Sequence, residues 1–197
     1  MPLTTLDPTP ALVIIDLQKG IVSGSVAHVV PNAAALANAF REHDLPVVLV
    51  NVTGRAPGRT DADSGGSHGS TGTLAAGWAD IIDELERQPG DYLITKRRRS
   101  AFHDTGLNTL LRDLGVTQTV LAGVSTSAGV ESTARSAHDH GYHVVLATDA
   151  MADRDRDSHR HSLERVFPKL GETATSAEII DFLDRGLPGP DRAGRPS

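Results

Sequence analysis

The feature that most constrains the fold is a series of short apolar runs separated by segments with helical spacing. The runs are rich in valine and isoleucine and cover residues 11–15, 47–51, 92–95, 119–122 and 142–147. They are apolar throughout rather than at every second position. Such runs are typical of strands in a parallel sheet that is covered on both faces.

Helical patterns fill the spaces between these runs. Apolar residues recur at helical spacing in residues 32–43, 106–114, 129–140, 158–170 and 176–183. A last short strand is expected near Thr173. Alternation of strands and helices favours a doubly wound α/β fold. The sequence therefore predicts a three-layer α/β/α sandwich with a six-stranded, mostly parallel sheet.

Two segments lie outside this alternation. Residues 53–77 are rich in Gly, Ser and Asp and are too long for an ordinary connection, so they are a candidate lid or binding loop. Residues 186–197 are rich in Pro and Gly and are predicted to be a disordered tail. The length of 197 residues fits a single domain over residues 1–185, followed by that tail.

Composition excludes several classes of function. The chain contains no cysteine, which rules out disulfides, thiolate metal sites and thiol catalysis. The net charge of −6 argues against a nucleic-acid partner, which usually requires a basic surface. The N-terminus shows no secretory pattern, and no apolar run has the length of a membrane helix. We therefore expect a cytoplasmic protein with no membrane partner that acts on small molecules.

Polar residues follow several of the predicted strands. Asp16 and Lys96 lie at strand ends, and the turn at residues 123–127 leads directly into a helix. In open parallel sheets, ligands bind beyond the carboxyl ends of the strands. Asp16 and Lys96 at adjacent strand ends would pair, and the turn could bind an anion through its N–H groups. Each feature also has a structural interpretation: a helix cap, a solvated charge cluster at 96–99, and packing glycines.

Four segments resemble a known family. They read VIIDLQ (13–18), ITKRRRSAF (94–102), LAGVSTSAGVESTAR (121–135) and GYHVVLATDA (141–150). They are similar, in order and spacing, to the signature blocks of the isochorismatase-like hydrolases. The resemblance covers about residues 10 to 185 and implies a parallel six-stranded sheet with helices on both faces. It also implies a homo-oligomer, a dimer or larger.

The resemblance assigns roles to particular residues. Most members of the family are cysteine hydrolases that act on amides, and their Asp and Lys match Asp16 and Lys96. Gly129 stands where these members have the nucleophilic Cys. Glycine cannot attack a carbonyl group, so the covalent acyl-enzyme route is closed. The resemblance further implies a cis peptide bond between Val124 and Ser125.

A serine does not replace the missing nucleophile in this alignment. Ser125, Ser127 and Ser132 lie near Gly129, but none matches its position, and no histidine stands beside Ser127 in the block. Isochorismatases proper also have Gly there, and they protonate a vinyl ether with the Asp before water adds. The present chain departs from them in Arg97–Arg99 and in Thr126–Ala128. The resemblance thus extends to the mechanism more readily than to the substrate.

Neither a metal nor a cofactor is expected. Nicotinamidase-like members bind zinc through Asp-x-His after the second strand, where this chain has residues 53–55. Asp61, Asp63 and His68 come later in the same loop. His159 and His161 are two residues apart and would face different sides of a helix.

The predicted site follows from these arguments. Its catalytic positions are Asp16, Lys96 and Gly129, the position of the family's Cys. Its expected substrate-binding residues are Gln18, Arg98, Ser125, Thr126, Ser127, Ala128 and Val130. Arg55 and the arginines at 97–99 could bind a substrate carboxylate, or they are simply solvated.

Three functions remain open at this point. The chain could hydrolyse an enol ether such as isochorismate by acid–base chemistry. It could instead hydrolyse an amide with a water activated by Asp16, or it could be a non-catalytic binding or assembly protein of the same family.

Overall fold

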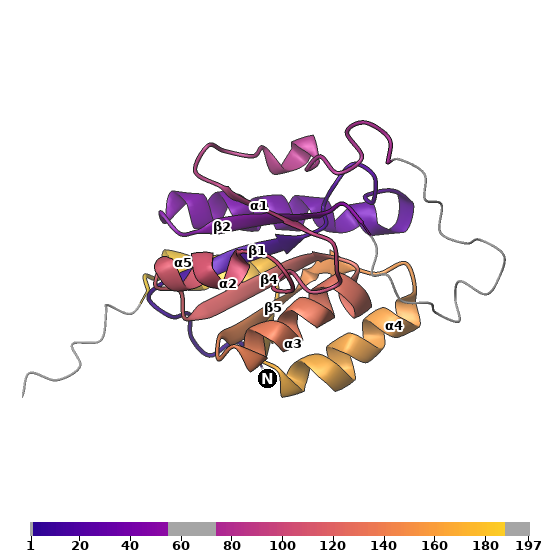
Figure 1. Ribbon diagram of the computed structural model, residues 1–197. Helices are drawn as coiled ribbons and strands as arrows, with labels where there is room; N and C mark the ends of the chain where they lie inside the picture. The colour runs from indigo at the N-terminus through magenta and orange to yellow at the C-terminus, as the bar shows by residue number, and fades with distance from the viewer. Residues whose placement is uncertain (1, 55–73, 188–197) are drawn as a thin grey trace, which may run out of the picture.

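The computed structural model describes residues 2–54 and 74–187, and it contains a six-stranded sheet with the order β3-β2-β1-β4-β5-β6 (Figure 1). The strands are β1 (Pro10–Ile15), β2 (Val47–Val52), β3 (Tyr92–Lys96), β4 (Gln118–Val124), β5 (His143–Ala152) and β6 (Glu172–Ala174). All neighbouring strands are parallel. The predicted α/β sandwich is confirmed.

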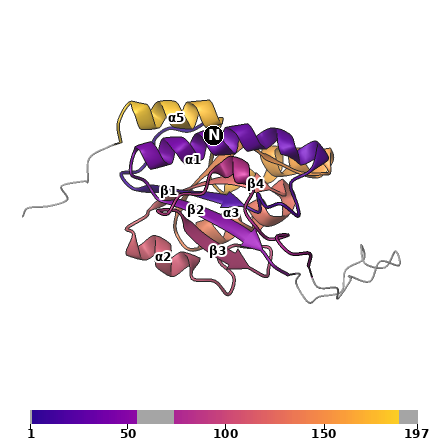
Figure 2. The same cartoon turned by 90° about the horizontal axis from the view of Figure 1, so that it is seen from above.

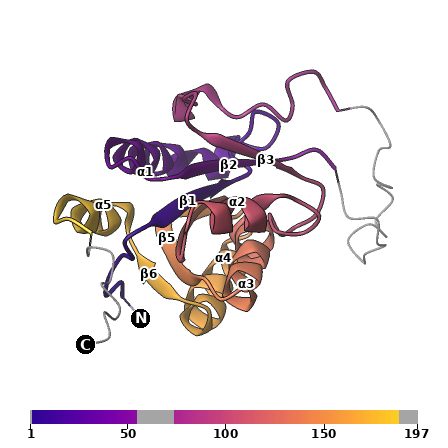
Figure 3. The same cartoon turned by 60° about the vertical axis from the view of Figure 1, so that its left-hand side comes forward.

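Helices cover both faces of the sheet, as Figure 2 and Figure 3 show from two directions. One face carries α1 (Val30–Glu42) and α5 (Ser176–Asp184), with the 3-10 helices η1 (Gly24–Val29) and η3 (Asp83–Leu85) beside α1. The other face carries α2 (Leu107–Asp113), α3 (Glu131–Asp139) and α4 (Arg156–His161). The sheet is thus the middle layer of three.

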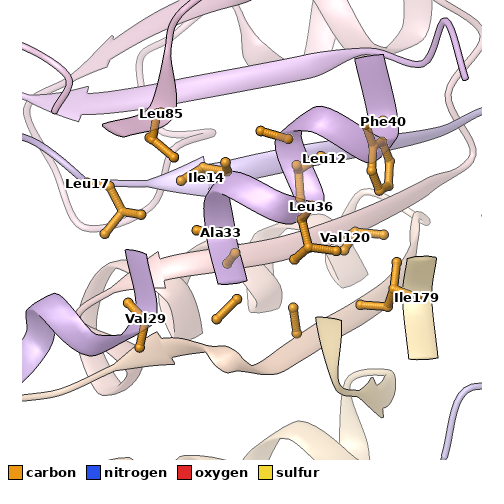
Figure 4. Close-up of a cluster of buried hydrophobic side chains, with 14 of the residues drawn as sticks. Leu12, Ile14, Leu17, Val29, Ala33, Leu36, Phe40, Leu85, Val120 and Ile179 are labelled. Atoms are coloured by element: carbon orange, nitrogen blue, oxygen red, sulfur yellow. The ribbon is translucent and has the colours of Figure 1, made fainter. Parts of the chain in front are cut away.

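The central strand β1 explains why both layers are needed. Leu12 and Ile14 pack against α1 and its neighbours, as Figure 4 shows, whereas Val13 and Ile15 pack on the opposite face. All residues of β1 are buried. Full burial of such a side chain is worth about 1.5–3 kcal/mol, so the strand is stable only when helices cover both of its faces.

Several predicted boundaries were wrong near the carboxyl ends of the strands. The helix expected from residue 129 is preceded by a π-helical turn, η4 (Thr126–Val130). Strand β5 does not end at Asp149, because the register between β4 and β5 shifts after Leu121 and β5 pairs again up to Ala152. The helix expected at 158–170 is divided into α4, a second π-turn η5 (Ser162–Val166) and a 3-10 turn η6 (Phe167–Lys169).

Asp149 has another role than ending a strand. Its carboxylate accepts hydrogen bonds from the Ser176 backbone N–H (2.6 Å) and from the Ser176 hydroxyl (2.8 Å). It therefore ties the middle of β5 to the start of α5.

Part of the sequence-based prediction lies outside the described residues. This applies to most of the candidate lid at 53–77, including Arg55, Asp61, Asp63 and His68, and to tail residues 188–197. Within 2–54 and 74–187, no helix is long and apolar enough to cross a membrane. Those same residues contain no group of three or more His, Asp or Glu side chains arranged to hold a metal ion.

Candidate active site

Asp16 and Lys96 meet at the carboxyl edge of the sheet. Asp16 directly follows β1, and Lys96 is the last residue of β3. These strands are not adjacent as expected, because β2 lies between them. The long lysine side chain spans that gap, and its Nζ lies 2.7 Å from Asp16 Oδ2. Both side chains are almost fully buried, with exposed fractions of 3% and 8%.

The local backbone and the surroundings of Asp16 are both unusual. Its φ angle of 54° places it in the left-handed region, which Asp tolerates better than most residues. Its second oxygen, Oδ1, is buried and has no hydrogen-bond partner among the described residues. Burial raises the pKa of Asp16 to about 6, because desolvation outweighs the opposing effect of the Lys96 charge. The carboxyl group can therefore carry or release a proton near neutral pH.

Gly129 faces this carboxyl group. A Cβ atom built at Gly129 would lie 3.2 Å from Asp16 Oδ2 and 3.0 Å from Ile15 Cγ2. A side chain at this position would therefore point at the Asp16–Lys96 pair.

The end of β4 brings Gly129 to this place. Gly123 has a φ angle of 113°, and a Cβ there would lie 2.0 Å from the Ile15 carbonyl oxygen, so only glycine fits. The following peptide bond, Val124–Ser125, is cis, which confirms the expectation drawn from the family blocks. Next comes η4, which leads into α3 with Gly129 buried in the turn.

Comparison with known proteins decides the family. Residues 10–178 match the family model described as "Isochorismatase domain". The chain belongs to the isochorismatase-like hydrolases. It is 41% identical over 175 residues to the uncharacterized isochorismatase family protein YwoC of Bacillus subtilis, covering 87% of this chain and 92% of that protein.

Two further comparisons give the range of the family. The structure of an isochorismatase family protein from Burkholderia thailandensis superimposes with a TM-score of 0.84 at 39% identity, covering 91% of this chain and 98% of that one. The maleamate amidohydrolase of Pseudomonas putida is 27% identical over 190 residues, covering 88% of this chain and 86% of that protein. The chain is therefore a hydrolase of a family whose members include an amidohydrolase.

Two residues expected to bind substrate in this isochorismatase-family hydrolase have other contacts. Gln18 is fully buried, and its Nε2 donates to the carbonyl groups of Val52 (3.1 Å) and Trp78 (3.2 Å), while its Oε1 accepts from Val52 N–H (2.8 Å). Gln18 therefore joins the main chain on either side of the long connection after β2. Arg98 is half-buried and contributes its carbonyl oxygen, which accepts a 3.2 Å hydrogen bond from Lys96 Nζ.

Three of the backbone amides predicted to bind an anion in the turn at 125–130 have partners within the protein. Ser127 N–H donates to Asp153 Oδ2 (2.9 Å), and the N–H groups of Ala128 and Val130 both donate to the Ser125 carbonyl (3.1 and 3.2 Å). These three amides are thus engaged within the protein. Asp153 also brings a carboxylate to the turn, which disfavours an anion there.

Asp153 and His159 were not predicted to take part in the site. The Ser127 hydroxyl donates to Asp153 Oδ2 (2.7 Å), and Thr126 Oγ1 lies 2.8 Å from His159 Nδ1 on α4. Burial lowers the pKa of His159, with Asp153 opposing the shift. Asp153 follows the carboxyl end of β5, so the strand-end rule could have found it. The sequence pattern points to His159 only as a possible metal ligand.

A hollow elsewhere on the surface does not contain Asp16 or Lys96. It has a volume of about 640 Å³ and is lined by Lys19, Asn51, Leu93 and residues from 79 to 88. We place the candidate site at Asp16 and Lys96 rather than in this hollow, because the two opposite charges are in direct contact, almost fully buried, and face Gly129 at the carboxyl edge of the sheet.

Proposed function

We propose that this chain hydrolyses the enol-ether bond of a small molecule such as isochorismate, with Asp16 as the general acid and Lys96 as its charge partner. The observation that carries the proposal is the buried Asp16–Lys96 pair facing a glycine. A carboxyl group with a pKa of about 6 retains a proton in a substantial fraction of molecules near neutral pH. General acids with such pKa values are suited to transfer a proton in the rate-limiting step.

The reaction needs no nucleophilic side chain. Asp16 would donate its proton to the terminal carbon of the vinyl group, which leaves an oxocarbenium ion. Water then adds to the cationic carbon and returns a proton to Asp16, which gives a hemiketal. The bond between that carbon and the ether oxygen breaks as the hemiketal hydroxyl proton passes to the oxygen, so that pyruvate is released and the ring keeps the oxygen as an alcohol. Lys96 would stabilise the carboxylate that forms when the proton leaves. Proton transfer of this kind typically contributes about 10²–10⁴-fold to the rate.

Amide hydrolysis is the second candidate, and one comparison favours it. The maleamate amidohydrolase named above acts, by its name, on an amide. In that reaction Asp16 would be ionised and would remove a proton from the attacking water. The residues are the same in both proposals, but the required protonation state of Asp16 is opposite.

A substrate screen combined with a pH profile separates the two candidates. Purified protein is tested for pyruvate release from isochorismate and for ammonia release from maleamate and other small amides. If Asp16 is the acid, kcat/KM falls as the pH rises above about 6; if it is the base, kcat/KM rises through the same range. Amide turnover with a rising profile would replace the first proposal by the second.

A further inference from the structure

The site lies between two segments that are far apart in the sequence. The loop at 97–101 follows β3 and accepts a hydrogen bond from Lys96 Nζ through the Arg98 carbonyl. The other segment is η4 with the start of α3, which contains Gly129. Lys96 is hydrogen-bonded to the first segment, and Gly129, whose Cβ position faces Asp16, lies in the second.

Thr133 connects the two segments directly. It lies on α3 and is completely buried. Its Oγ1 accepts a hydrogen bond from the Ala101 backbone N–H (3.0 Å) and donates one to the Gly129 carbonyl oxygen (2.7 Å). The hydroxyl proton and one lone pair are both used, and each partner belongs to a segment that borders the site.

A series of contacts links the residues that border the site. Lys96 pairs with Asp16, and the loop at 97–101 accepts a hydrogen bond from Lys96. Thr133 is hydrogen-bonded both to that loop and to Gly129. A Cβ atom built at Gly129 would in turn lie 3.2 Å from Asp16 Oδ2. We propose that Thr133 is a positioning residue, which sets the separation between Gly129 and the Asp16–Lys96 pair by binding the loop and the Gly129 carbonyl with the same hydroxyl group. The expected effect of Thr133 on turnover rests on the function proposed above.

A second bridge lies one helical turn away and supplies the control. Ser100 Oγ donates to Ser136 Oγ (2.8 Å), and Ser136 Oγ donates to the Ser132 carbonyl oxygen (3.1 Å). This bridge joins the same loop to the same helix, but it is half-buried and does not contact Gly129. Ser136→Ala therefore removes a comparable link between loop and helix but leaves both hydrogen bonds of Thr133 in place.

The experiment measures the Asp16 pKa in the full-length chain by a ¹³C NMR titration of its carboxyl carbon, which is assigned by comparison with Asp16→Asn. In Thr133→Val the loop is released and the Lys96 contact weakens, so the pKa should rise above its wild-type value. Thr133→Ser retains both hydrogen bonds and should leave the pKa unchanged, as should Ser136→Ala. Turnover should fall in Thr133→Val only, by up to about 10²-fold for a displacement near 1 Å.

Three results would overturn the inference. These are a wild-type pKa and turnover in folded Thr133→Val, a shift in Thr133→Ser as large as that in Thr133→Val, or an equal shift in Ser136→Ala. If Thr133→Val does not fold, Thr133→Ala with Thr133→Ser provides the same comparison. The titration needs no substrate, so it tests Thr133 even if wild-type turnover in Asp16→Asn has refuted the proposed function.

Discussion

Replacement of Asp16 by Asn should make the protein more stable and less active at the same time. The folded state binds the Asp16 proton more tightly than the unfolded chain does, because burial raises the pKa from 3.8 to about 6. At about 1.36 kcal/mol for each pH unit, this difference corresponds to about 3 kcal/mol. Stability is therefore lost as the pH rises from about 4 to about 6, where the unfolded chain ionises first.

Asn removes this penalty, since the amide is close in shape to the protonated carboxyl group and has no charge to desolvate. The free energies of unfolding of the variant and the wild type should agree near pH 4. Above pH 6 the variant should be more stable by up to about 3 kcal/mol. Urea unfolding followed by circular dichroism across this pH range measures the difference.

Turnover is measured on the same preparations. It should fall by about 10²–10⁴-fold in Asp16→Asn, because the amide cannot donate a proton at neutral pH. Asp113→Asn is the control, since Asp113 is exposed at the end of α2 that leads towards the start of β4, and it should retain full activity. A variant that is less stable at every pH and turns over at the wild-type rate would refute the reasoning.

The remaining predictions concern the partner of Asp16, the glycine opposite it and the assembly. Lys96→Met removes the charge that lowers the Asp16 pKa, so that pKa should rise further and turnover should fall. The double variant with Asp16→Asn should have a kcat no lower than that of the less active single variant, which steady-state kinetics measures. Gly129→Ala places a Cβ 3.2 Å from Asp16 Oδ2 and should reduce turnover, whereas Gly106→Ala, with nothing within 4 Å of its Cβ, should not. A homo-oligomer is expected in sedimentation at micromolar concentration, and a monomer alone would contradict that expectation.

Some of the site could be predicted because its residues are marked by their place along the chain. Asp16 and Lys96 each follow an apolar strand, and side chains at such ends gather at one edge of a parallel sheet. Gln18 also follows β1, but its amide group is hydrogen-bonded to the main chain. A sequence pattern places a residue near an edge but does not say whether its polar atoms meet substrate or the main chain, as Gln18 meets Val52.

The sequence by itself determined the alternation of elements, the absence of a cysteine nucleophile and the candidates for the acid and its partner. These depend on residue types and on spacing within a few turns or strands, which are local properties. The tertiary structure alone decided that β2 separates β1 from β3, that Asp153 occupies the amide of Ser127, and that Thr133 joins the two sides of the site. It also decided the pKa of Asp16, because desolvation is the sum of contacts with atoms from distant segments, and here it outweighs the effect of the Lys96 charge.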